Sequence, residues 1–273
     1  MSLLRVSRSE NASPGKGLTF MMDRTVLVTG AAGVVGSLIV PPLLQRYRLR
    51  LLDVRTLESA LVPGNVEQIV ADLRDEADVM AAVRGVDTIV HLAGNADPTA
   101  TWDALAGSNV EATQKLWHAA RMEGIRRLVF ASSNHVTGMY DLDGQRPVSP
   151  HWPARPCCLY GVTKHFGETI ARFYSDRFGL STICLRLGWV LLKPHNRRAR
   201  RQWLSPNDLV GYVTAAIEID RQYGLYYAVS ANTNRDWDTS NVSELAYRPV
   251  DNAEVYASQM VSDSSDELPA CQR

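Results

Sequence analysis

A tyrosine and a lysine stand four positions apart in the sequence YGVTK, at residues 160–164. They open a segment whose later apolar residues keep helical spacing, and residues four apart lie on one face of a helix. The Lys164 ammonium can therefore approach the Tyr160 phenol, and a nearby positive charge lowers the pKa of a tyrosine. Such a tyrosinate can take a proton from an alcohol while a hydride leaves the same carbon. Pairs of this kind also occur on many plain helices, so the interpretation depends on where the fold places this one.

A glycine-rich turn follows the first apolar segment of the chain. Residues 25–29 lead directly into TGAAGVVG, at 29–36, and an amphipathic segment comes next. In a dinucleotide-binding turn the first glycine permits a tight bend, the second lets the backbone approach a pyrophosphate, and the third lets helix and strand pack closely. The N–H groups at the start of the helix then hold the phosphates. A plain helix cap is the alternative. The predicted cofactor-binding residues of the turn are Gly30, Gly33, Val34, Val35 and Gly36.

An acidic residue ends the second apolar segment. Asp53 lies 53 − 30 = 23 positions after the first glycine, close to the roughly 20 expected for a carboxylate that binds ribose. A carboxylate accepts hydrogen bonds from a 2′-hydroxyl and repels a 2′-phosphate, so Asp53 favours NAD over NADP. Arg55 leaves NADP open, because a nearby arginine can accept the phosphate. Residues that end the next two apolar segments complete the predicted groove: Asp72, Leu73, Leu92, Ala93 and Gly94.

Short runs rich in Val, Ile and Leu alternate with segments of helical period from residue 24 onward. The runs predict strands at 25–29, 48–53, 66–70, 88–92, 128–132, 182–187 and 226–229. The other segments predict helices at 34–47, 75–83, 101–123, 160–178 and 206–219. Pro41 and Pro42 should kink the first helix or end it early. Continuous apolar strands separated by helices predict an α/β fold with a doubly wound, Rossmann-type parallel sheet. Ligands bind at the carboxyl edge of such sheets, where FASSNH, at 130–135, offers hydroxyls.

Composition excludes several classes of function. The 273 residues include 29 Lys plus Arg and 29 Asp plus Glu, and a formal charge of zero offers no bulk attraction to nucleic acid or an anionic membrane. No run approaches the roughly 18 apolar residues of a membrane span, and the start lacks the apolar stretch of a secretory signal. The cysteines have no C-x-x-C spacing and no histidine near them at ligand spacing, which predicts thiols of a cytoplasmic protein and no metal site. They are Cys157, Cys158, Cys184 and Cys271.

The sequence divides into four parts. Residues 1–23 are polar and aperiodic and predict a disordered N-terminal tail. Residues 24–187 form the predicted dinucleotide-binding domain, which includes the helix with Tyr160 and Lys164. Residues 188–251 are predicted to form a small substrate-binding region. Residues 252–273, which end in SDSSDELPACQR, predict a polar C-terminal tail.

Four motifs together resemble the extended short-chain dehydrogenase/reductase superfamily of NAD-dependent epimerases and dehydratases. They are TGAAGVVG, HLAG, FASSNH and YGVTK, and the resemblance covers residues 25 to about 250. Within it, SSNH at 132–135, WLS at 203–205 and NAE at 252–254 are similar to uronate dehydrogenases. DP at 97–98 and WD at 102–103 are similar to related sugar 1-dehydrogenases.

The resemblance implies roles for the matching residues. Tyr160 is the general base, and Lys164 is its partner and also holds the nicotinamide ribose. Ser133 hydrogen-bonds the reacting oxygen. Asn134 and His135 match positions that contact substrate, although a buried structural histidine is an equal alternative for His135.

Three further positions follow from the resemblance. Asn109 matches an asparagine that organises the cofactor site, with a purely local hydrogen bond as the alternative. Arg198 matches the arginine that binds the carboxylate in uronate dehydrogenases, whereas its neighbours Arg200 and Arg201 are interpreted as solvated. Trp189 is a departure, because the family usually has a serine where Trp189 follows Gly188. The bulky residue puts the family's substrate in question more than its chemistry.

These observations predict an NAD-dependent dehydrogenase that oxidises C1 of a cyclic sugar acid to an aldonolactone. A sugar-phosphate or neutral aldose 1-dehydrogenase is the alternative, since an arginine-rich loop binds phosphate as readily as carboxylate. A nucleotide-sugar epimerase or dehydratase fits less well, because only 273 − 187 = 86 residues follow the sixth strand. A non-catalytic NAD(P)-binding sensor is disfavoured by the intact Ser133, Tyr160 and Lys164. The expected partner is a small sugar, with a homo-oligomer left open.

Overall fold

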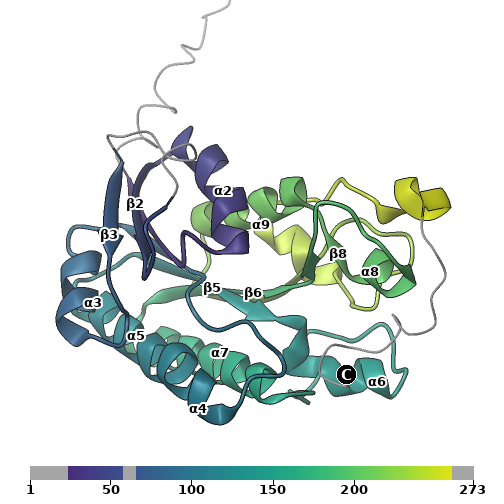
Figure 1. Ribbon diagram of the computed structural model, residues 1–273, viewed down its shortest axis with the longest axis horizontal. Coiled ribbons are helices and arrows are strands. Elements are labelled where there is room, and N and C mark those ends of the chain that lie inside the picture. The colour runs from purple at the N-terminus through teal and green to yellow at the C-terminus, as the bar shows by residue number, and fades with distance from the viewer. Residues whose placement is uncertain (1–23, 58–65, 260–273) are drawn as a thin grey trace, which may run out of the picture.

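A seven-stranded parallel sheet forms the centre of the computed structural model, which describes residues 24–57 and 66–259 (Figure 1). The strand order is β3-β2-β1-β4-β5-β6-β9. The strands are β1 Thr25–Thr29, β2 Arg48–Asp53, β3 Glu67–Val70, β4 Thr88–His91, β5 Arg127–Ser133, β6 Ser181–Leu187 and β9 Tyr223–Ala228. The order reverses between β1 and β4, which opens a crevice at their carboxyl ends. The predicted doubly wound fold is confirmed.

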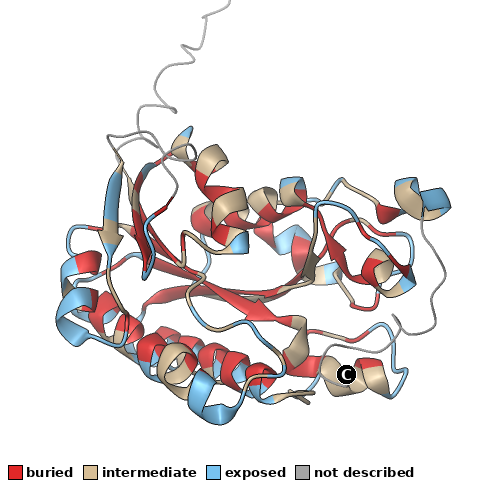
Figure 2. Ribbon diagram, viewed as in Figure 1, coloured by how far each residue is buried: buried red, intermediate tan, exposed pale blue. Residues whose placement is uncertain are grey.

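Helices cover both faces of this sheet (Figure 1). The face with α2 and α9 and the face with α3, α5 and α7 each bury an apolar cluster. Figure 2 shows the strands largely buried between the two helical layers. The bounds are α2 Val34–Leu44, α3 Glu76–Val83, α5 Ala112–Met122, α7 Leu159–Phe178 and α9 Pro206–Glu218. Each predicted strand is present, although some ends are shifted, and every predicted helix except 101–123 is a single helix.

Two predicted helices differ from the structure in a way that matters. Helix α2 ends at Leu44 rather than at 47 and contains both prolines near its end, in agreement with an early stop. The predicted helix 101–123 is three elements: α4 Trp102–Leu105, the π-helix η1 Ala106–Glu111, and α5. A single π-helical turn inside a helix is frequent at functional sites, and this one contains Asn109.

A smaller region follows β6 and packs beside the carboxyl edge of the sheet (Figure 1). Its parallel strand pair joins Trp189 to Trp203 and Val190 to Leu204. Two short elements after β5 lie next to it, η2 Asn134–Thr137 and α6 Gly138–Leu142. Its own elements are β7 Trp189–Val190, α8 Arg197–Gln202, β8 Trp203–Leu204, η3 Ser240–Leu245 and η4 Ala253–Gln259.

The predicted C-terminal tail begins too early. The structure describes an ordered helix η4 as far as Gln259, because polar groups in this stretch bind the body of the protein. The Ala253 N–H donates to the Asn232 side chain at 3.1 Å, and the Tyr256 ring meets Trp203 edge-on at 5.6 Å between centroids. The predicted N-terminal tail, residues 260–273 and Cys271 lie outside the described residues. Among the helices that are described, none is long and apolar enough to cross a membrane.

Candidate active site

Two cavities adjoin along the carboxyl edge of the sheet and share Leu92 and Gly94 in their walls. The first holds most of the predicted cofactor residues: Gly30, Gly33, Asp53, Asp72, Leu73, Leu92, Ala93 and Gly94. The second, of about 480 Å³, is lined by Val35, Ser133, Asn134, His135, Tyr160, Lys164 and Arg198. The shared wall makes them one groove, with the glycine turn at one end and the tyrosine at the other.

The glycine turn is shaped by close backbone contacts. Gly30 has a φ of +70°, and a Cβ there would lie 2.7 Å from the Ala93 nitrogen. A Cβ on Gly36 would lie 2.4 Å from the Ala31 oxygen. Gly33 is the N-cap of α2 and offers no side chain to cap it, so the first-turn N–H groups remain for a ligand. This cradle, which any Cβ would fill, fits the pyrophosphate of a dinucleotide.

Asp53 lies at the rim of the first cavity. Its carboxylate accepts hydrogen bonds from the Ala32 N–H at 2.9 Å and the Arg55 N–H at 3.1 Å. The Arg55 guanidinium lies 3.6 Å from the same carboxylate, is largely exposed, and donates to the Ala32 carbonyl. These contacts fix the carboxylate beside the glycine turn, and they place Arg55 close enough to influence the choice between NAD and NADP.

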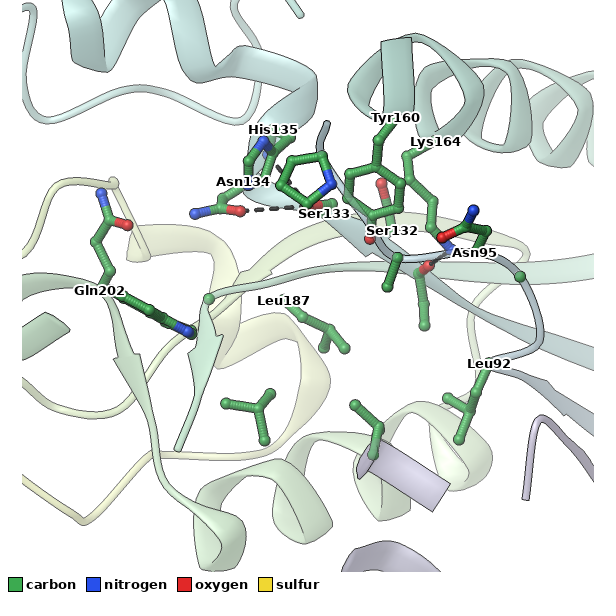
Figure 3. A pocket seen from close by; sticks show the side chains of 18 of the residues that line it. Leu92, Asn95, Ser132, Ser133, Asn134, His135, Tyr160, Lys164, Leu187 and Gln202 are labelled. Atoms are coloured by element: carbon green, nitrogen blue, oxygen red, sulfur yellow. Dashed lines mark hydrogen bonds between the residues drawn. The ribbon is translucent and has the colours of Figure 1, made fainter. Parts of the chain in front are cut away.

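Tyr160, Lys164 and Ser133 meet in the second cavity (Figure 3). Burial raises the pKa of Tyr160 to about 12, and a hydrogen bond with Ser133 acts in the opposite direction. The Lys164 Nζ atom donates to the Ala131 carbonyl at 2.8 Å and lies 5.8 Å from the Tyr160 ring centroid. Burial lowers the pKa of Lys164 to about 8. The pair shares a helix face as predicted, but the expected lowering of the tyrosine pKa is wrong for this arrangement, because burial dominates.

A buried ion pair supports the end of β5. Glu168 forms two 2.8 Å hydrogen bonds with Arg186 and accepts one of 2.6 Å from the Ser132 hydroxyl. Burial alone would raise the pKa of Glu168, but Arg186 holds it below the usual value. Glu168 was not among the predicted site residues, although its spacing offered a signal: Tyr160, Lys164 and Glu168 recur every four positions on one helix face.

Asn109 lies behind the groove rather than in it. Its side chain accepts from the Asn95 N–H at 2.7 Å and donates to the Asn95 carbonyl at 2.8 Å and the Thr163 hydroxyl at 3.1 Å. It lines neither cavity. The asparagine therefore joins the loop after β4 to the helix that carries Tyr160.

Asn134 and His135 both line the second cavity. Asn134 accepts a hydrogen bond from the Ser133 hydroxyl at 3.2 Å. The His135 ring meets Tyr160 edge-on, with 5.6 Å between centroids, and Figure 3 shows the two rings side by side. His135 is partly exposed at the cavity wall rather than buried.

Arg198 lines the same cavity and is held by a carboxylate. Its Nη2 group donates to Asp141, which also accepts from Arg146 and Gln202. Burial would raise the pKa of Asp141, but the charges of Arg198 and Arg146 keep it below the usual value. The side chain of Asp141 is 3% exposed, so this carboxylate fixes one edge of the guanidinium from behind the cavity.

The interpretation of Arg200 and Arg201 as solvated is wrong. Arg201 donates at 2.9 Å to Asp236, whose carboxylate is fully buried. Arg200 lies 3.5 Å from Glu254 in η4. Both partners come from segments distant in sequence, which is why the run RRARR looked like a plain basic loop.

The far wall of the cavity is formed by residues that follow β6. Trp189 lines it, in agreement with the expected bulk at this position, and meets the His195 ring edge-on at 5.0 Å. Gln202 also lines it, whereas Asn95 lines the cavity beside Lys164 (Figure 3). No local pattern marks Gln202 or Asn95. The pairing of β7 with β8 brings Gln202 to the cavity, and Asn109 holds the loop after β4 that carries Asn95.

Comparison with known proteins agrees with this geometry. Residues 26–191 match the model of the NAD dependent epimerase/dehydratase family. The chain belongs to this family. It is 36% identical over 239 residues to a uronate dehydrogenase from Pseudomonas syringae, covering 86% of this chain and 85% of that one. It is also 36% identical over 251 residues to the NAD-dependent glucose-6-phosphate dehydrogenase of Haloferax volcanii, covering 85% and 95%.

Two solved structures share this fold, and one of them contains NAD. A uronate dehydrogenase mutant from Agrobacterium tumefaciens, complexed with NAD, superposes with a TM-score of 0.78 at 33% identity and covers 90% of both chains. The glucuronic acid dehydrogenase of Chromohalobacter salexigens gives a TM-score of 0.80 at 32% identity over 90% of both chains. The predicted resemblance is confirmed at the level of the family.

Proposed function

We propose that this protein is an NAD-dependent dehydrogenase that oxidises C1 of a cyclic sugar acid to an aldonolactone. The observation that carries the proposal is one cavity lined by Tyr160, Lys164 and Ser133 on one side and by Arg198 on another. This cavity opens into the groove of the glycine turn through Leu92 and Gly94. A base, a cofactor groove and a carboxylate-binding cation thus converge on one space.

The groove fits a dinucleotide along its length. The start of α2 would hold the pyrophosphate, and Asp53 would accept hydrogen bonds from the adenosine ribose. Lys164, at the junction with the second cavity, would hold the other ribose. When bound there, NAD supplies the acceptor for the hydride that leaves the sugar.

The residues of the chain move the proton. The Tyr160 phenolate oxygen accepts the C1 hydroxyl proton, and the Ser133 hydroxyl, in the wall of the same cavity, orients the sugar oxygen. Lys164 supplies a positive charge 5.8 Å from the ring centroid, which favours phenolate over phenol. Because burial raises the pKa of Tyr160 to about 12 and lowers that of Lys164 to about 8, the rate of oxidation should rise with pH up to about 8 and stop rising above it, where Lys164 loses its charge.

Arg198 determines the class of sugar. Arg198 lines the cavity, and the planar fork of N–H donors on a guanidinium matches the two oxygens of a carboxylate. Asp141 restricts the rotation of the side chain and lowers the entropy lost on binding. The predicted substrate is a hexuronate whose C6 carboxylate meets Arg198 while C1 faces Tyr160.

A sugar phosphate is the second candidate. A guanidinium binds phosphate as well as carboxylate, and the relative from H. volcanii is named for glucose 6-phosphate. The bulk of Trp189 in the cavity wall favours the smaller carboxylate.

The test is a substrate panel read by NADH absorbance. Glucuronate, galacturonate, glucose 6-phosphate and glucose are compared at equal concentrations with NAD. The proposal predicts the highest kcat/KM for a uronate. A higher value for glucose 6-phosphate would favour the second candidate, and oxidation of glucose alone would remove the role of Arg198.

A further inference from the structure

Three side chains with metal-ligating atoms meet beside the candidate active site: His135, Cys157 and Cys158. His135 belongs to η2 after β5, and the two cysteines immediately precede α7. The His135 Nδ1 atom lies 3.3 Å from the Sγ atom of each cysteine, and the three atoms all lie within 4.8 Å of one another. The sequence analysis predicted no metal site because no histidine stands near these cysteines along the chain. The fold brings one from 22 positions away.

The spacing and chemistry of these atoms suit a zinc ion. Zn–N bonds of about 2.1 Å and Zn–S bonds of about 2.3 Å at tetrahedral angles separate nitrogen from sulfur by about 3.6 Å, close to the 3.3 Å found here. One imidazole and two thiolates select a soft or borderline ion rather than magnesium or calcium. Three protein ligands leave the fourth tetrahedral position open to water.

The backbone holds this cluster in place. The Cys157 N–H donates to the His135 carbonyl at 3.3 Å. A Cβ on Gly161 would lie 2.5 Å from the same carbonyl, so the first turn of α7 packs directly on His135. Cys158 is the N-cap of α7, and its sulfur accepts from the Gly161 N–H at 3.5 Å. The positive end of a helix favours a thiolate at this position.

We propose that His135 Nδ1, Cys157 Sγ and Cys158 Sγ form a binding site for Zn²⁺ whose occupancy inhibits the dehydrogenase. On binding, each thiol loses its proton to solvent and a Zn–S bond replaces the S–H bond. The oxidation states of zinc and sulfur do not change.

The inhibition, unlike the site, rests on the proposed function. When zinc occupies Nδ1 of His135, the ring can contact a sugar only as a hydrogen-bond donor, through Nε2–H. The zinc also fixes this ring 5.6 Å from that of Tyr160. Figure 3 shows this ring at the wall of the cavity. Zinc should therefore raise the KM for glucuronate and leave the KM for NAD unchanged.

The direct test is a titration of the reduced full-length protein with Co²⁺, followed by displacement with Zn²⁺. The site predicts thiolate-to-cobalt charge-transfer absorption that saturates at one ion per chain. Cys157→Ser and Cys158→Ser should each weaken cobalt binding at least roughly 10- to 100-fold, the loss that substitutions around a metal site typically cause. Cys184→Ala is the matched control, because that thiol is buried in β6 outside the cluster.

Each outcome decides one part of the proposal. Cobalt spectra without thiolate bands, or bands unchanged in both serine variants, would overturn the site. In a second arm, NADH formation from glucuronate is measured with and without Zn²⁺. Inhibition of the wild type but not of Cys157→Ser supports the link to turnover, and metal binding without inhibition overturns it. If glucuronate is not oxidised at all, the proposed function fails while the cobalt spectra still decide the site.

Discussion

The two ends of the groove are held together in different ways. The cofactor end rests on regular parallel strands and on glycines where a Cβ would come within 3 Å of backbone, as at Gly30 and Gly36. The sugar end rests on two-residue strands, short helices and buried charges such as Asp141 and Asp236. Under the proposed function, backbone geometry specifies the cofactor, whereas side-chain pairs specify the sugar. We therefore expect substitutions at the sugar end to leave the cofactor end undisturbed.

The largest expected effect separates chemistry from cofactor binding. Tyr160→Phe removes the base and should lower kcat for glucuronate by roughly 10²- to 10⁴-fold. The glycine turn and Asp53 are untouched, so the Kd for NAD, measured by calorimetry, should change little. A variant that keeps a large share of the wild-type kcat would remove Tyr160 from the mechanism.

Loss of a buried carboxylate should damage the sugar end selectively. Asp141→Asn leaves Arg198 and Arg146 without their shared negative charge, and breaking a buried pair costs about 3 kcal/mol or more. We expect a lower urea midpoint and a higher KM for glucuronate, with the Kd for NAD retained. Asp143→Asn is the matched control, because the side chains of Asp143 and its partner Arg155 are 42% and 38% exposed. Exposed ion pairs contribute about 1 kcal/mol or less. Equal effects of both substitutions would contradict the proposed division of the molecule.

Stability and function should conflict at Lys164. Burial lowers the pKa of this ammonium from 10.5 to about 8, so the folded state binds its proton less readily than the unfolded state does. The resulting destabilisation, about 3 kcal/mol, is fully present below pH 8 and disappears as the pH rises towards 10.5. Lys164→Met should therefore raise the free energy of unfolding near pH 7, lose the gain at high pH, and abolish activity. Urea unfolding at pH 7 and pH 10 measures this, and no gain at pH 7 would refute it.

A smaller effect is expected on cofactor choice. Asp53→Ala removes the carboxylate that repels a 2′-phosphate, and hydrogen bonds to charged groups contribute about 1.5–3 kcal/mol. The ratio of kcat/KM for NAD over NADP should fall roughly 10- to 100-fold. If the wild type already prefers NADP, the adjacent Arg55 outweighs Asp53.

The cofactor end was predictable from sequence, and the sugar end was only partly so. The glycine spacing, Asp53 and the YGVTK motif are local patterns that reflect one strand, one turn or one helix face, and the structure brings them to a single groove. The partners of Arg198 and Arg201 are Asp141 and Asp236, 57 and 35 positions away. No local pattern predicts such pairs.

The π-helical turn around Asn109 was also beyond local inference. Its sequence is compatible with an ordinary helix, which is what periodicity predicted. The wider turn is accompanied by contacts from the Asn109 side chain to Asn95 and Thr163. Both belong to other elements, so tertiary packing rather than propensity decides the conformation there.

The measurement that tests the central claim most directly compares Arg198→Ala with wild type on glucuronate and on glucose. We predict that kcat/KM for glucuronate falls by the equivalent of roughly 2–5 kcal/mol of transition-state stabilisation, because the carboxylate loses its charged partner. The kcat/KM for glucose should change little. Arg198→Lys should restore only part of the loss on glucuronate, since an ammonium cannot reproduce the planar fork. Arg200→Ala, on the same helix but paired with Glu254, should leave both sugars unaffected. Equal losses on the two sugars at Arg198 would mean that it supports the fold rather than the substrate, and would contradict the assignment to sugar acids.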